Sequence, residues 1–176
     1  MRTFIAVNLS DAVKDNINQV VEKLKKVDPG IKWVKKENLH ITLKFLGEVS
    51  EEKVKAVGDL LSEKLKDLQA IELKFIGIGS FPRVVWIATR NGAERLSKIW
   101  NQVEAVLEKE GFERDTRPFA AHVTIGRIKG NRNPKLKGEL EKLKDFDFGT
   151  DRISSISIMK STLGKTGPSY EEINKI

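Results

Sequence analysis

The sequence has no cysteine among its 176 residues. It can therefore form no disulfide bond, and it offers neither a thiolate metal ligand nor a cysteine nucleophile. No apolar run approaches the roughly 20 residues that a membrane-spanning helix needs. The opening segment MRTFIAVNLSD has too short an apolar stretch for a secretory signal peptide. We therefore expect a cytoplasmic protein with no membrane partner.

The composition is typical of a folded chain with a basic surface. Hydrophobic residues make up 39% and charged residues 32%, which is too apolar for intrinsic disorder and suits one domain, or two small lobes that share a core. Lysine and arginine outnumber the acidic residues, which leaves a net charge of +7. A basic chain favours anionic partners. We expect a monomer.

Hydrophobic periodicity and turn residues predict alternating strands and helices. Strands are expected at residues 4–9, 39–46, 71–78, 84–88, 121–128, 153–159 and 170–176, with an extended stretch beginning at Trp33. Helices are expected between Ser10 and Asp28, from Ser50 to Leu68, around residues 96–107, and from Pro134 to Leu143. The run from Gly79 to Pro82 predicts a turn.

The order of these elements repeats at an offset of about 82 residues, which places His40 opposite His122 and Phe4 opposite Trp86. The period is too long for a solenoid and indicates an internal duplication. We predict a single α+β domain built from two interleaved, pseudo-symmetric lobes, with approximate repeat units 1–80 and 81–176. Each lobe would be an antiparallel-rich sheet with helices on its outer face. The active-site groove would lie between the lobes.

The chain has only two histidines, and both occur in the same local pattern, HITL and HVTI. In a strand, residues two apart share a face. His40 and Thr42 would therefore point one way, and His122 and Thr124 would do the same in the second lobe. Each lobe would present one imidazole and one hydroxyl to the groove.

Two imidazoles on opposite sides of a reacting centre can divide the work of proton transfer, because each titrates near neutral pH. Displacement in line at phosphorus needs this arrangement, with hydroxyl groups donating hydrogen bonds to the non-bridging oxygens. A zinc site would need three or four ligands, and no further ligand pattern accompanies the histidines. Acyl transfer fits less well, because a nucleophile–base–carboxylate relay is missing.

The excess positive charge surrounds both histidines. Residues 31–44 carry a net charge of +3 and residues 111–135 a net charge of +4, which together equal the net charge of the whole chain. Arginine, whose planar fork gives two directed hydrogen bonds, suits a phosphate. The alternative interpretation of these segments is a solvated basic face.

The segments HITLKFLG and RPFAAHVTIGR resemble the paired motifs of the 2H phosphoesterase superfamily, and more narrowly those of the RNA 2′,3′-cyclic phosphodiesterase (2′-5′ RNA ligase) family. The resemblance covers essentially the whole chain. It implies a bilobal α+β fold with the site between the lobes and no required metal or other cofactor. Members of the family open a 2′,3′-cyclic phosphate end of RNA to a 2′-phosphate, and some join tRNA halves through a 2′-5′ bond.

The resemblance implies roles for individual residues. His40 would be the proton donor to the departing 3′ oxygen and His122 the general base that activates water, although the symmetry permits the reverse. Thr42 and Thr124 would hold the phosphate oxygens. Arg117 and Arg127 match basic positions of the family.

Other features leave alternatives open. Simple alternation turns Arg127 away from His122, unless a bulge at Gly126 turns it back or the strand ends there. Phe45 and Phe119 would either stack on a base or pack in the core. A nucleotide such as ATP or GTP is a further candidate ligand. The rival hypothesis for the whole chain is a non-catalytic RNA-binding module with a basic groove.

Overall fold

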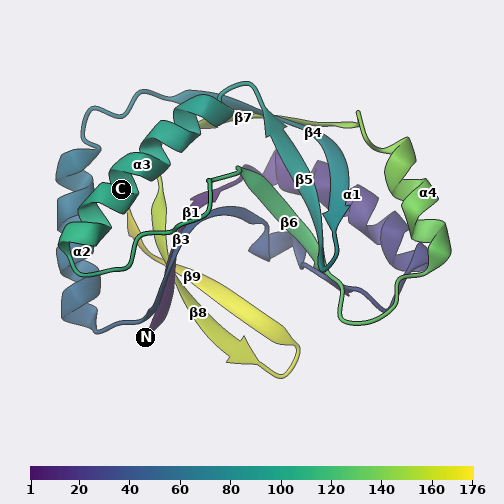
Figure 1. Ribbon diagram of the computed structural model, residues 1–176, viewed down its shortest axis with the longest axis horizontal. Coiled ribbons are helices and arrows are strands. Elements are labelled where there is room, and N and C mark those ends of the chain that lie inside the picture. The colour runs from purple at the N-terminus through teal and green to yellow at the C-terminus, as the bar shows by residue number, and fades with distance from the viewer.

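Two antiparallel sheets form the centre of the protein in the computed structural model, which describes residues 1–176 (Figure 1). The four-stranded sheet has the order β3-β1-β8-β9, and the five-stranded sheet has the order β2-β6-β5-β4-β7. The strands are β1 (Arg2–Asn8), β2 (Lys32–Trp33), β3 (His40–Glu48), β4 (Ile71–Phe81), β5 (Val84–Arg90), β6 (His122–Arg127), β7 (Asp147–Ile153), β8 (Ser157–Gly164) and β9 (Gly167–Lys175).

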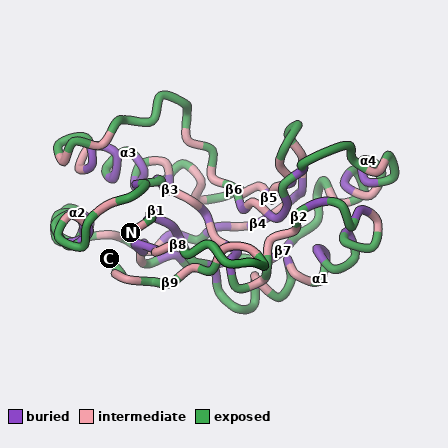
Figure 2. The backbone as a smooth tube through the Cα atoms, turned by 90° about the horizontal axis from the view of Figure 1, so that it is seen from below, coloured by how far each residue is buried: buried purple, intermediate pink, exposed green.

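Four helices cover the sheets in two pairs at opposite ends of the molecule (Figures 1 and 2). The helices are α1 (Asp11–Val27), α2 (Glu51–Lys64), α3 (Ala93–Lys109) and α4 (Pro134–Lys142), and a short 3₁₀ turn, η1 (Lys36–Asn38), precedes β3. The hydroxyls of Ser10 and Ser50 accept hydrogen bonds from backbone N–H groups in the first turns of α1 and α2, as expected of N-caps. None of the helices is long and apolar enough to cross a lipid bilayer.

The pair α2–α3 covers the outer face of the four-stranded sheet, and the pair α1–α4 covers the five-stranded sheet. In the first layer, Lys44 of β3 contacts Glu104 of α3. In the second, the side chain of Asn16 in α1 donates to the carbonyl of Phe148 in β7. One cluster of 37 buried hydrophobic residues runs through both layers. Figure 2 shows this burial concentrated in the strands and inner helix turns. These observations confirm the α+β two-lobe fold.

Strands from the beginning and the end of the chain occur together in the same sheet. β8 and β9, from the end of the sequence, lie beside β1, whereas β4 lies between β5 and β7 in the other sheet. The short strand β2 pairs with β6. Each sheet thus combines strands from both of the predicted repeat units.

The structure corrects several predictions along the chain. Gly79 to Phe81 continue β4 instead of forming a turn, and the chain reverses at Pro82–Arg83. The predicted strand 153–159 spans the end of β7, a short connection and the start of β8. β7 itself was not predicted, because the buried Asp151 and the positive φ of Gly149 interrupt its apolar alternation. Asp151 is satisfied in the fold by accepting a hydrogen bond from the backbone N–H of Ser10.

Candidate active site

The two strands that carry the His-x-Thr motifs, β3 and β6, contact each other although they belong to different sheets. Residues 32–40 connect them. β2 pairs with β6, and the backbone N–H of Val34 donates to the carbonyl of Ile125 at 2.9 Å. The chain then crosses through η1 and enters β3 at His40. This crossing brings the two motifs to the same part of the molecule.

Each motif ends in a β-bulge at its fourth residue. In β3, Thr42 and Lys44 oppose consecutive residues of β1, so Leu43 is the extra residue. In β6, Thr124 and Gly126 oppose consecutive residues of β5, so Ile125 is the extra residue. Both extra residues are buried. The duplication therefore extends to an irregularity of the backbone.

The bulges return the fifth residue after each histidine to the histidine's face. These residues are Phe45, which is 66% exposed, and Arg127. Of the alternatives for Arg127, the structure shows the bulge. A Cβ at Gly126 would lie 3.0 Å from the side chains of Ile31 and Trp33, so these neighbours would have to shift to admit a larger residue.

The sheet registers also correct the predicted offset. Phe4 pairs with Phe45 and Val84 pairs with Arg127, so the residue equivalent to Phe4 is Val84. The predicted equivalence with Trp86 is wrong by two residues. The lengths of the connections between the first and second strands of the two lobes differ by that amount.

Both imidazole rings are held in the same way. The Nδ1 atom of His40 lies 2.7 Å from the carbonyl oxygen of Asn38, and that of His122 lies 2.7 Å from the carbonyl oxygen of Ala120. A carbonyl only accepts, so Nδ1 carries a proton in each ring. In the neutral ring, Nε2 is then the free base. The hydroxyl of Thr42 donates to Nε2 of His40 at 2.9 Å, whereas Nε2 of His122 has no protein partner.

The surroundings of His40 favour its neutral form. Its ring lies 5.0 Å from the ring of Phe4 and edge-on to Tyr170 at 5.3 Å. Desolvation by burial lowers the pKa of His40, the positive charges of Lys14 and Arg127 lower it further, and the hydrogen bond to Asn38 opposes them. Burial also raises the pKa of Tyr170. The neutral ring of His40 is therefore favoured in the free protein.

A pocket of about 420 Å³ opens beside His40. It brings together His40, Thr42, Phe45 and Arg127 from the predicted site, and its other lining residues include Arg2 and Tyr170. No carboxylate lines it. His122 and Thr124 are not part of its lining, but they share the face of β6 on which Arg127 lies.

The remaining predicted residues lie elsewhere. Arg117 is exposed in the loop between α3 and β6, where its side chain makes no hydrogen bond or ion pair and does not line the pocket. Phe119 stacks on Trp100 with ring centroids 5.4 Å apart, so it packs with the core. The structure therefore does not bring Arg117 and Phe119 into the pocket.

Two residues of the site were missed by sequence reasoning. Asn38 is buried, and while its carbonyl holds His40, its side-chain amide donates to the carbonyl of Pro168 near the turn of the β8–β9 hairpin. It is a positioning residue that ties this hairpin to the imidazole. Tyr170 reaches His40 only because β9 joins the sheet of β3. No local sequence signal marks either residue.

Comparisons with known proteins identify the family of this chain. The model of the family described as LigT-like phosphoesterase matches the chain twice, over residues 7–86 and 87–170. A protein from Methanocaldococcus jannaschii named RNA 2′,3′-cyclic phosphodiesterase is 42% identical, with 99% of each chain covered. A protein of the same name from Archaeoglobus fulgidus is 38% identical, with 98% of each chain covered.

Solved structures share the fold. The crystal structure of Escherichia coli LigT complexed with 3′-AMP superposes with a TM-score of 0.77 at 23% identity, covering 99% of this chain and 96% of that one. The same protein has also been solved in complex with ATP. The family match spans nearly the whole sequence and confirms the resemblance to the family. This chain belongs to the LigT-like phosphoesterase family, within the 2H phosphoesterases.

Proposed function

We propose that this protein hydrolyses the 2′,3′-cyclic phosphate end of RNA to a 2′-phosphate without a metal ion. The observation that carries the proposal is the duplicated histidine geometry. Each imidazole is anchored through Nδ1 to a carbonyl oxygen two residues earlier, and each is followed by a threonine and a bulge. Binding of RNA alone would need basic and aromatic residues but no matched pair of anchored imidazoles. The names of the curated relatives support the substrate.

The proposed reaction has one bond formed and one broken at phosphorus. His122, whose Nε2 is free and exposed, removes a proton from the attacking water. The water oxygen bonds to phosphorus as the bond to the 3′ oxygen breaks, and protonated His40 gives its Nε2 proton to that oxygen. Both imidazoles then return to their starting states by proton exchange with solvent. The reverse assignment uses the same groups with their roles exchanged.

Binding of substrate prepares His40 to act as an acid. In the free protein its pKa is lowered, mainly by burial. A phosphate anion held between His40 and Arg127 adds a negative charge beside the imidazole, which favours the protonated ring. The hydroxyls of Thr42 and Thr124 would donate to the non-bridging oxygens. Phe45, at the rim of the pocket, would stack on the terminal base.

The same site would join RNA ends through a 2′-5′ bond if the 5′ hydroxyl of a second RNA replaced water as the nucleophile. The base would take the proton of that hydroxyl, its oxygen would bond to phosphorus, and the 3′ oxygen would leave with the proton of the acid. We therefore propose RNA with a cyclic phosphate end, tRNA halves included, as the partner of this site. A nucleotide such as ATP is a further candidate ligand of this pocket, since the E. coli protein has been solved in complex with 3′-AMP and with ATP. A cytoplasmic monomer remains our expectation.

Turnover in the presence of a chelator tests this function. An oligonucleotide that ends in a 2′,3′-cyclic phosphate should be hydrolysed at the same rate with and without EDTA. No three side chains of His, Asp or Glu cluster to hold a metal ion. A non-catalytic RNA-binding module would instead bind the oligonucleotide in a salt-sensitive manner and yield no product after long incubation. That result, or loss of turnover in EDTA, would contradict the proposal.

A further inference from the structure

A second, smaller pocket adjoins the one beside His40. Its volume is about 130 Å³, and Arg127 and Pro168 line both pockets. Lys32, Trp33 and Lys35 form one side of it, and residues 166–168 of the β8–β9 hairpin form the other. The Nζ atom of Lys35 lies 3.4 Å from the hydroxyl of Thr166 across this opening. The two pockets are therefore neighbours along one path under the hairpin.

The cations of this second pocket have no acidic partner. Lys32 and Arg127 are directly opposite each other in the β2–β6 pair, and like charges in that position destabilise a sheet. Neither they nor Lys35 form an ion pair, and no carboxylate lines either pocket. The fold thus keeps three cations together at one place without neutralising them. A bound anion would relieve their repulsion.

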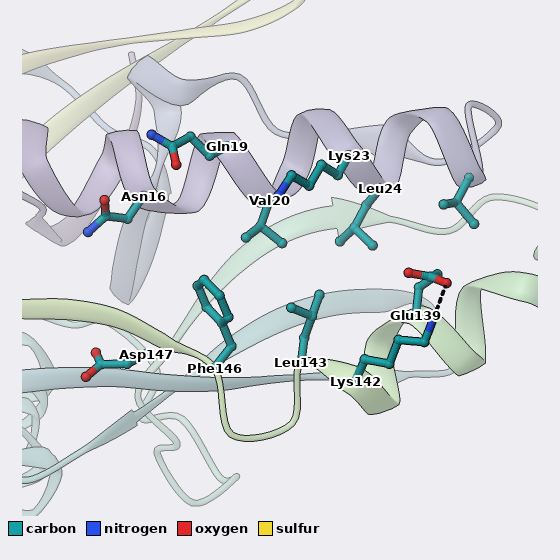
Figure 3. Close-up of a pocket in the computed structure, with 11 residues that line it drawn as sticks. Asn16, Gln19, Val20, Lys23, Leu24, Glu139, Lys142, Leu143, Phe146 and Asp147 are labelled. Atoms are coloured by element: carbon teal, nitrogen blue, oxygen red, sulfur yellow. Dashed lines mark hydrogen bonds and ion pairs between the residues drawn. The ribbon is translucent and has the colours of Figure 1, made fainter.

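Another pocket of this protein has both acidic and basic residues in its lining. Figure 3 shows the space of about 360 Å³ between α1 and α4, where apolar side chains face one another and Glu139 and Asp147 lie among the lining residues. There the ammonium group of Lys142 lies 3.0 Å from the carboxylate of Glu139. That pocket has internally balanced charge and is remote from both motifs. The absence of carboxylates beside Arg127 is a distinct property of the two neighbouring pockets.

We propose that Lys32, Lys35 and Arg127 form a subsite for the phosphodiester on the 5′ side of the terminal nucleotide. The inference rests on the proposed function, since it places the cyclic phosphate in the pocket beside His40. An RNA strand with its end in that pocket must leave it, and the path through Arg127 and Pro168 leads to the lysines. A positively charged groove of this kind follows the backbone of a single strand without reading its sequence. The subsite would make the protein prefer oligonucleotides over mononucleotides.

Substrates that differ only at the 5′ end test the subsite. Three are needed: a nucleoside 2′,3′-cyclic phosphate with a free 5′ hydroxyl, the same compound with a 5′ phosphate, and a dinucleotide with a cyclic phosphate end. We expect the variant Lys32→Ala/Lys35→Ala to lose about tenfold or more in kcat/KM on the last two, because it removes charged contacts to their phosphate. Its kcat/KM on the 5′-hydroxyl compound should stay within about twofold of the wild-type value, since that compound leaves the subsite empty.

The matched control is Lys64→Ala/Lys98→Ala, which removes two exposed, unpaired lysines from the pocket between α2 and α3. It changes the net charge equally and should leave all three rates unchanged. Equal losses on all three substrates in the Lys32→Ala/Lys35→Ala variant, or no loss on any, would overturn the subsite while leaving the proposed function intact. If the wild-type protein turned over none of the three, the proposed function would fail and the subsite with it.

Discussion

Alanine in place of His40 or His122 is expected to lower kcat on a cyclic-phosphate-ended oligonucleotide by about 10²–10⁴-fold, which is the range for losing a general acid or base. The fold should survive both changes, because His122 is exposed and His40 is only partly buried at the pocket. Initial rates and thermal unfolding of each variant measure the two effects. Undiminished turnover in either folded variant would refute the assignment of that histidine.

A sulfur leaving group distinguishes the acid from the base. In a cyclic phosphate whose 3′ bridging oxygen is replaced by sulfur, the leaving group needs little protonation. The variant that lacks the acid should recover most of its lost rate on this substrate, whereas the variant that lacks the base should not. Recovery in His40→Ala supports His40 as the donor. Recovery in His122→Ala would exchange the two roles.

The pH dependence makes the same distinction without mutation. Burial holds the pKa of His40 below its ordinary value of 6.5 in the free protein. If His40 donates, kcat/KM, which reports the free protein, falls as pH rises through that lowered pKa. Bound phosphate raises the pKa of His40, so the corresponding fall in kcat should occur at higher pH. If His40 is the base instead, it must be unprotonated to act. The rise of the rate on the acidic side is then the feature that differs between the pH profiles of kcat/KM and kcat.

Breaking the buried ion pair between Lys44 and Glu104 is expected to cause a much larger loss of stability than breaking an exposed ion pair. The Nζ atom lies 2.9 Å and 3.2 Å from the two carboxylate oxygens, and the side chains are 9% and 1% exposed. Removal of one partner leaves an uncompensated buried charge. Lys44→Met should therefore lower the free energy of unfolding by about 3–5 kcal/mol, measured by denaturant titration.

This ion pair also supports the second motif. The ammonium of Lys44 donates to the carbonyl of Glu113, and the carboxylate of Glu104 accepts from the backbone N–H of Asp115. Both contacts anchor the loop that leads into His122. The matched control is Lys55→Met, which breaks an exposed pair with Asp59 and should cause no measurable change. Equal stability of the Lys44→Met and Lys55→Met variants would contradict the structural role of the buried pair.

The sequence predicted the strands that carry the two motifs better than it predicted the residues that surround the site. Local patterns are sufficient for the helix caps at Ser10 and Ser50, and the paired His-x-Thr motifs mark two strand faces. The position of Arg127 depends on a bulge, which alternation alone does not specify. The contact of Asn38 with Pro168 and that of Tyr170 with His40 depend on the order of the strands, which places β9 in the sheet of the first motif. No pattern in a single segment contains that information.

The strands that mix the two repeat units in each sheet were hard to predict for the same reason. A buried aspartate in β7 and the long exposed hairpin β8–β9 both depart from the apolar alternation by which strands are recognised. The burial of Asp151 depends on Ser10, which lies 141 residues away in the chain. Sequence periodicity reports the local environment of a segment, so it predicted the two motif strands and most of β9 but missed β7 and the outer part of β8.

Phosphorus NMR of the reaction product tests the central claim most directly. The substrate is an oligonucleotide with a 2′,3′-cyclic phosphate end, incubated with the wild-type protein in EDTA. We predict that the cyclic phosphate signal is replaced by that of a 2′-phosphomonoester, because the 3′ oxygen departs. A 3′-phosphomonoester would show that the other oxygen leaves, and an unchanged cyclic phosphate would show that the two histidines do not act on this substrate.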